Sequence, residues 1–194
     1  CPLSPGLTSM YYYGSIHVAK FKWQCNLQFN KSLHYQYEVD VTLDPDTAHP
    51  KLILSEDGKQ VHCGGVAKVL PDNPKRFTKY TLVLTRQSFS SGRFYFEVQV
   101  KDKTAWWLGV VRESIDRKCE TTWTPETGYW TLFYYKDSFV FIDNPPLCLP
   151  LRAELQKVGV FVDYDEGLVS FYDVEARDHI YSATETTKTT NVVY

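Results

Sequence analysis

Phe94-Tyr95-Phe96-Glu97-Val98-Gln99-Val100 is the stretch with the clearest pattern in this 194-residue chain, because apolar side chains recur at every second position. Successive side chains of a β-strand point to opposite faces, so a period of two predicts a strand with one apolar face. That face carries Phe94, Phe96, Val98 and Val100, and the opposite face carries Tyr95, Glu97 and Gln99.

Further strand patterns lie on both sides of this stretch. The segment 106–111 is almost continuously apolar, as expected for a strand covered on both faces. Two hairpins are predicted, from 128–135 with 138–142 and from 158–164 with 168–174. Shorter strands are predicted at 41–43, 52–54, 60–62 and 81–84. No stretch shows a sustained helical period, so the sequence predicts an all-β sandwich or barrel.

Composition narrows the class of protein. Hydrophobic residues make up 43% of the chain and aromatic residues 15%, which is enough for a core and favours strands. The net charge of -2 and a pI near 6.2 argue against a nucleic-acid partner. No apolar run approaches 18 residues, so no membrane span is predicted. The five cysteines form no CxxC pair, which favours free thiols in a reducing, cytoplasmic setting.

Motifs for catalysis and cofactor binding are missing from the sequence. It contains neither a glycine-rich phosphate loop nor a GxSxG or HExxH motif, and its five histidines have no ligand spacing. We therefore expect no enzyme activity, no cofactor and no metal. Asp163, Asp165 and Glu166 could form a cation site or an acid/base pair, but their place at a hairpin tip favours a turn. The basic segment 75–79 is interpreted as a solvated loop.

Aromatic residues crowd two of the predicted strands. Trp106 and Trp107 are adjacent, so they must point to opposite faces. In the next strand one face carries Tyr129, Thr131, Phe133 and Tyr135, and the other carries Trp130, Leu132 and Tyr134. One face of each strand builds the core. The opposite face is either a protein interface, for which exposed aromatic clusters are typical anchors, or a surface that a loop covers.

The order of several motifs resembles the PRY-SPRY family. The PRY-like part is Asp40-Val41-Thr42-Leu43-Asp44-Pro45-Asp46 followed by Leu52-Ile53-Leu54-Ser55-Glu56-Asp57-Gly58. The SPRY-like part runs through Phe94-Tyr95-Phe96-Glu97-Val98, Trp107-Leu108-Gly109-Val110, Gly128-Tyr129-Trp130-Thr131-Leu132, Val158-Gly159-Val160-Phe161-Val162-Asp163-Tyr164 and Val169-Ser170-Phe171-Tyr172.

This resemblance implies a bent sandwich of two antiparallel sheets that recognises a protein or peptide. Such domains are the C-terminal parts of tripartite-motif ubiquitin ligases, butyrophilins and some fish innate sensors. Any ligase activity would reside in a RING domain, whose cysteines this chain lacks, and regions outside the chain would set the oligomeric state. The chain is divided into an N-terminal extension (1–37), a PRY segment (38–88), a SPRY segment (89–182) and a divergent tail (183–194).

The resemblance also implies where a partner binds. The position after the first Trp of the family's W-x-L-G-V stretch lines a shallow pocket, and here that residue is Trp107. The strand after G-[YF]-W-T contributes Phe133 and Tyr135, and the variable segment 69–80 can also meet the partner. Some family members instead sense a small anion in a basic pocket. Here Arg112 is followed closely by Glu113 and Asp116, without a basic cluster.

The two ends of the chain depart from the family pattern. After His179-Ile180-Tyr181 the family continues into closing strands, whereas this chain continues into a Thr-rich tail. We therefore expect the closing strand to be missing and one sheet edge to be open. The alternating stretch from Ser15 to Trp23 is hypothesised to cover that edge.

Overall fold

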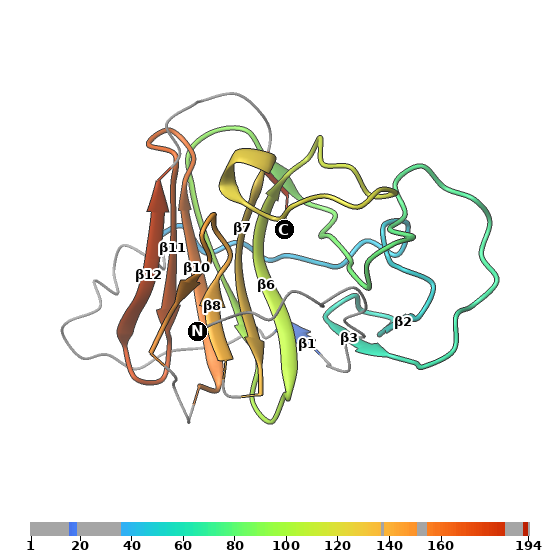
Figure 1. The fold of residues 1–194 in the computed structure, drawn as a ribbon, viewed down its shortest axis with the longest axis horizontal. Coiled ribbons are helices and arrows are strands. Elements are labelled where there is room, and N and C mark those ends of the chain that lie inside the picture. The colour runs from blue at the N-terminus through green and yellow to red at the C-terminus, as the bar shows by residue number, and fades with distance from the viewer. Residues whose placement is uncertain (1–15, 19–35, 137, 151–154, 185–191, 194) are drawn as a thin grey trace.

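The computed structural model describes residues 16–18, 36–136, 138–150, 155–184 and 192–193. Within this part of the chain, two antiparallel sheets pack face to face (Figure 1), which confirms the predicted all-β sandwich. The seven-stranded sheet has the order β12-β11-β10-β5-β1-β3-β2, and the six-stranded sheet has the order β4-β13-β6-β7-β8-β9.

The first sheet contains β1 (Ile16–Val18), β2 (Leu52–Leu54), β3 (Gln60–Cys63), β5 (Arg93–Gln99), β10 (Lys157–Asp163), β11 (Leu168–Asp173) and β12 (Asp178–Thr184). The second contains β4 (Ser88–Phe89), β6 (Ala105–Arg112), β7 (Tyr129–Tyr135), β8 (Ser138–Phe141), β9 (Leu147–Cys148) and β13 (Val192–Val193). A short 3-10 helix, η1 (Pro125–Thr127), precedes β7. No described helix is long and apolar enough to cross a membrane.

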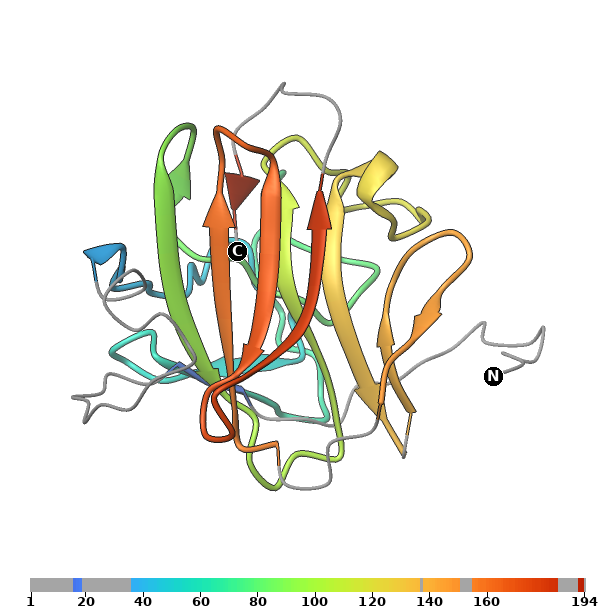
Figure 2. The ribbon, with the colours of Figure 1, turned by 90° about the vertical axis from the view of Figure 1, so that its left-hand side faces the viewer.

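The main core lies between the two sheets, where the alternation of the strands places it. Figure 2 shows β10, β11 and β12 side by side in front of the second sheet. Phe96 of β5 lies beside Val160 of β10 in the first sheet, and both are buried. The second sheet contributes buried Leu132 and Phe141 from β7 and β8. The apolar period that begins at Phe94 therefore marks the face of β5 that points into the sandwich.

Both predicted hairpins are confirmed by the strand register. Tyr135 pairs with Ser138 at the turn from β7 to β8, and Asp163 pairs with Leu168 at the turn from β10 to β11. The predicted strands at 41–43 and 81–84 are wrong, since only an isolated bridge joins Leu43 to Thr85 there. These short apolar runs are buried by packing of a loop, as the contact of Leu43 with the buried cluster around Leu52 and Val61 shows.

The strand prediction near the N-terminus is confirmed at Ile16–Val18, but its place in the fold differs from the hypothesis. β1 pairs with β3 at Ile16 and with β5 at Val18, so it lies inside the seven-stranded sheet and covers no open edge. Ser15 and residues 19–23 lie outside the described part. β1 therefore links the hairpin β2-β3 to β5.

The prediction that the closing strand is missing is wrong at Val192–Val193. This pair forms β13 between β4 and β6, with Val192 opposite both Phe89 and Arg112. Strand pairing uses backbone N–H and C=O groups, so a two-residue β-branched segment can satisfy a sheet edge without the family's motif. The only signal in the sequence was the Val-Val pair after the Thr-rich run.

A buried charged pair lies on the face of β5 that points away from the main core. The ammonium group of Lys157 is 3.2 Å from Oε2 of Glu97, and the hydroxyl of Tyr95 donates to Oε1 of Glu97 at 3.0 Å. Both charged side chains are buried. Burial raises the pKa of Glu97, although Lys157 and Tyr95 both act to lower it.

We predict that Lys157→Met destabilises the fold by about 3–5 kcal/mol at neutral pH, because it leaves Glu97 buried without its cation. A raised folded-state pKa means that the folded protein binds the proton more tightly than the unfolded chain does. The loss should therefore shrink as the pH falls from 8 towards 5, because protonation of Glu97 removes the unpaired buried charge. Urea unfolding of the parent protein and the variant across this pH range measures the loss of unfolding free energy. A loss independent of pH would contradict the role of Lys157 as the counter-ion of Glu97.

We also predict that deleting residues 1–18 lowers the melting temperature by several degrees. The deletion removes hydrogen bonds from β1 to two neighbours, each with a net value of about 1 kcal/mol. Calorimetry of this variant and of a shorter deletion, of residues 1–13, isolates the contribution of β1. Equal melting of the longer deletion and the parent protein would show that β1 does not hold the hairpin β2-β3 and β5 together.

Candidate functional site

The pairing of β6 with β7 brings the three candidate residues together. Trp107 lies directly opposite Phe133, and Ala105 lies opposite Tyr135, so the three aromatic side chains share one face of the six-stranded sheet. The ring centroids of Trp107 and Phe133 are 5.0 Å apart, and those of Phe133 and Tyr135 are 6.3 Å apart. They form a continuous aromatic row, which we call the outer aromatic row.

The same register settles which aromatic residues build the core. Trp106 and Trp130 point between the sheets and are buried, and Trp106 stacks on Tyr134 with ring centroids 5.6 Å apart. Trp107 points the other way and is half-buried. The two adjacent tryptophans thus face opposite sides of β6, as alternation requires.

Much of the outer face of the sheet is covered by loops. Phe77 and Leu84 from the segment between β3 and β4, together with Trp123, form a second buried cluster on Val111 and Tyr129. Tyr129 is consequently only 2% exposed. Phe133, which contacts Trp107, is 5% exposed, whereas Tyr135 is 37% exposed. The interpretation that a loop covers this face is therefore correct at Tyr129. The face opens towards Tyr135.

Trp123 is the residue of this region that the sequence patterns did not reveal. Its ring meets Trp107 edge-on at a centroid distance of 3.8 Å and stacks on Tyr129 at 5.6 Å with an interplanar angle of 4°. Tyr80 meets it edge-on at 4.6 Å. Trp123 lies in the loop between β6 and β7, where no strand period could assign it a face. The one signal is a tryptophan among threonines, at Thr121-Thr122-Trp123-Thr124.

The segment 69–80 divides into an exposed part and a buried part. Val69 is fully exposed, and Leu70 is 40% exposed. Arg76, by contrast, is buried and donates from one guanidinium nitrogen to the carbonyl oxygens of Pro45 at 2.9 Å and Ala48 at 2.7 Å. Phe77 follows it into the core. The interpretation of 75–79 as a solvated loop is therefore wrong at Arg76 and Phe77, because the backbone carbonyls of 45–48 supply acceptors inside.

The charged groups near this face give no support to an anion pocket. Arg112 lies 5.6 Å from the ring centroid of Trp130 and donates to the carbonyl of Glu126 at 3.4 Å. Lys136 lies over the ring of Tyr135 at 5.0 Å. Arg117, a further cation of the loop after β6, donates to the carbonyls of Lys75 and Glu113. Arg112 ends β6, Arg117 lies in the loop after it, and Lys136 lies in the turn between β7 and β8.

The acidic cluster at the tip of β10-β11 closes the turn. Asp163 pairs with Arg93 at 2.6 Å and accepts from the backbone N–H of Glu166 at 3.2 Å. Asp165 accepts from the backbone N–H of Gly92 at 3.3 Å. The interpretation as turn residues fits these bonds. No group of three metal-ligating side chains occurs in the part of the chain that the structure describes.

Comparison with known proteins agrees with this fold and its motifs. The family model of the SPRY-associated domain, PRY, matches residues 41–89, and the model of the SPRY domain matches residues 93–194. Human butyrophilin subfamily 2 member A2 is 45% identical over 76% of this chain and 28% of its own length. Human zinc finger protein RFP is 45% identical over 78% of this chain and 30% of its own length.

Two further comparisons complete these findings. Human pyrin is 46% identical over 75% of the chain and 19% of its own length, so the chain spans less than a third of these relatives. Among solved structures, the TRIM65 PSpry domain has a TM-score of 0.71 at 22% identity, covering 88% of this chain and 91% of that one. Stonustoxin has a TM-score of 0.67 at 22% identity, and the match covers 84% of this chain and 27% of the stonustoxin chain. The structural matches support the fold.

The different burial of the residues in the outer aromatic row predicts that their alanine variants lose different amounts of unfolding free energy. Phe133→Ala should cost about 3–5 kcal/mol of unfolding free energy, because it empties a buried ring site. Tyr135→Ala should cost less, about 1 kcal/mol, because more than a third of the residue is exposed. Urea denaturation of the two variants tests this order. A cost for Tyr135→Ala as large as that for Phe133→Ala would mean that Tyr135 is a structural residue.

Proposed function

Because the chain belongs to the PRY-SPRY family, we propose that it is a recognition module that binds a protein or peptide through the open end of the outer aromatic row. The observation that carries this proposal is the graded exposure along the row. Phe133 is buried, Trp107 is half-buried and Tyr135 is exposed. A surface aromatic ring held from below by rigid neighbours loses little conformational freedom when a partner covers it.

Each residue of the row has a distinct part in this proposal. Tyr135 offers its ring and its hydroxyl to the partner, the combination that makes tyrosine frequent at interfaces. Phe133 holds the Tyr135 ring from behind, and Trp107 forms the rim that is fixed by Trp123. Lys136, which lies over the Tyr135 ring, adds a positive charge beside the contact. The exposed segment 66–70 lies outside the row and is a second surface that a partner could use.

The family assignment makes this chain a binding domain. Any catalytic activity of a longer protein, such as ubiquitin transfer, would reside in another domain. The described cysteines Cys63, Cys119 and Cys148 are free, and the last two are exposed. Exposed free thiols persist in reducing compartments, which supports our proposal of a cytoplasmic site of action. A role in innate immunity is proposed because human pyrin and a butyrophilin are among the relatives.

The proposal predicts that Tyr135→Ala removes a partner that the parent protein captures. Truncating an interface hot spot costs about 2 kcal/mol or more, which weakens binding roughly thirtyfold. Quantitative affinity capture from an immune-cell lysate measures the loss, followed by titration of the purified partner. Leu147→Ala is the matched control, because Leu147 is similarly exposed, at 42%, on β9 of the same sheet.

Retention of every captured protein by Tyr135→Ala would contradict the proposed site. In that event a Val69→Asp variant would show whether the exposed segment 66–70 binds the partner instead.

A further inference from the structure

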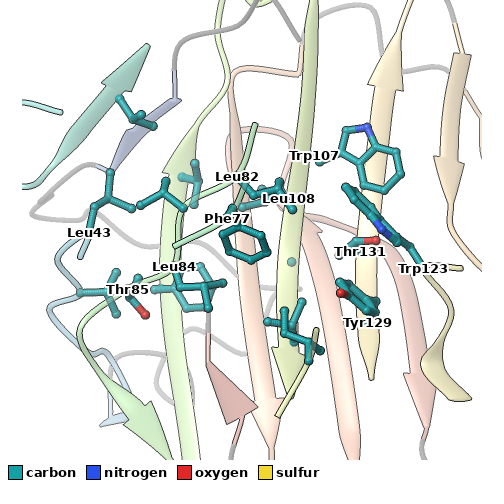
Figure 3. A pocket seen from close by; sticks show the side chains of 18 residues that line it. Leu43, Phe77, Leu82, Leu84, Thr85, Trp107, Leu108, Trp123, Tyr129 and Thr131 are labelled. Carbon is teal, nitrogen blue, oxygen red and sulfur yellow. The ribbon is translucent and has the colours of Figure 1, made fainter. Parts of the chain in front are cut away.

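A cavity of about 110 Å³ lies beside β6, where three hydrophobic clusters meet (Figure 3). Leu108 and Phe96 come from the main core. Phe77 and Leu84 come from the second buried cluster, and Leu43 comes from the cluster around Leu52 and Val61. Protein interiors are close-packed, so a cavity marks a place where the side chains of neighbouring clusters do not meet.

Two features of the sheet keep this space open. β13 pairs with β6 only at Val111 and Arg112, so the other β6 residues that line the cavity, Trp107, Leu108 and Gly109, have no β13 neighbour. In addition, Gly109 lies opposite Thr131, and because glycine has no side chain, it leaves the Thr131 side chain uncovered on that side. A Cβ atom at Gly109 would stand 2.0 Å from the carbonyl oxygen of Trp130, so no other residue fits there without a shift of the backbone.

The walls of the cavity are apolar apart from a few polar atoms. Thr85 donates its hydroxyl to the carbonyl of Gln87 at 3.0 Å, and the hydroxyl of Tyr129 is 3.5 Å from the carbonyl of Asp116. By contrast, Oγ1 of Thr131 and Nε1 of Trp123 are buried and have no hydrogen-bond partner among the residues that the structure describes. Thr131 is 6% exposed and Trp123 is 7% exposed.

These two polar side chains belong to the same wall. Trp123 stacks on Tyr129 and contacts Trp107, and these residues flank Thr131 on the outer face of the sheet. Figure 3 shows Trp123 and Thr131 next to each other on the β7 side of the pocket. A buried polar atom without a partner costs about 1–3 kcal/mol, so two of them at one wall call for a group that can satisfy them.

We propose that this cavity binds a small uncharged molecule that has an apolar body and one acceptor oxygen, such as a ketone, an ester or an ether. The indole N–H of Trp123 and the hydroxyl of Thr131, both at this wall, are the hydrogen-bond donors that would hold the oxygen of such a molecule. No charged side chain lines the cavity, which excludes an ionic ligand on grounds of desolvation. An apolar cavity of roughly 150 Å³ accepts benzene, so the occupant here is a five-membered ring or a similar body.

The decisive experiment compares cyclopentanone with methylenecyclopentane, which has nearly the same shape but lacks the oxygen. We expect both probes to raise the melting temperature in proportion to concentration, and the ketone to bind roughly three- to tenfold more tightly. The ketone alone should shift the indole N–H resonance of Trp123 in a nitrogen–proton correlation spectrum. Equal affinity for the two probes would overturn the assignment of Thr131 and Trp123 as ligand donors.

Two variants locate the binding. Thr131→Val keeps the outline of the side chain and removes its hydroxyl, so it should fold at least as stably and should lose much of the preference for the ketone. Leu82→Phe adds volume from a half-exposed wall residue and should abolish binding of both probes. Unchanged binding by Leu82→Phe would place the probes elsewhere and overturn the proposal.

This inference goes beyond the proposed partner site and can fail independently of it. The probes are tested on the isolated chain without any partner, while partner capture depends on Tyr135, which does not line the cavity. A third outcome separates the two possible occupants. Failure of both probes to bind, together with loss of a captured partner in Leu82→Phe, would assign the cavity to a side chain of that partner and overturn the small-molecule proposal.

Discussion

The register between β6 and β7 is the constraint on which the core, the outer aromatic row and the cavity all depend. With Trp107 opposite Phe133, Trp106 and Trp130 fall inside the sandwich and the outer row falls outside it. A slip of one residue would exchange the faces, because side chains alternate with a period of two. Gly109 helps to hold this register, since its backbone approaches the carbonyl of Trp130 more closely than a larger residue allows.

In the proposed function, one aromatic row serves both stability and recognition, because loops cover part of it and leave its end open. The buried part gives Phe133 and Trp123 a fixed position, and the open end leaves Tyr135 exposed. A surface built only of exposed rings would be an aggregation hazard, whereas a fully covered one could bind nothing. On this proposal, the loop that follows β6 contributes to recognition by fixing Trp107 through Trp123.

Much of this architecture could be predicted from the sequence, and the failures have physical reasons. The alternation from Phe94 and the two hairpins predicted the long strands correctly, because strong period-two patterns leave one choice of buried face. Motif alignment grouped Trp107, Phe133 and Tyr135, and they share one face of the sheet. Their different burial was hidden, because Trp123, which packs on Trp107, comes from a loop without a period. Val192–Val193 was missed because a two-residue segment is too short to show a strand period. Arg76 looked like a surface residue, since the carbonyls that receive it lie far away in the sequence.

Both short strands near the chain ends occupy interior positions in their sheets, β1 between β3 and β5 and β13 between β4 and β6. A chain synthesised from its N-terminus therefore cannot complete either sheet from local pieces. β1 must wait for β5, which is made about 75 residues later, and β4 has no strand to pair with until Val192–Val193 leave the ribosome. Such long-range pairing slows folding. During synthesis, the edges of β4 and β6 that β13 joins would stay available to chaperones, or to neighbouring chains, until Val192–Val193 are made.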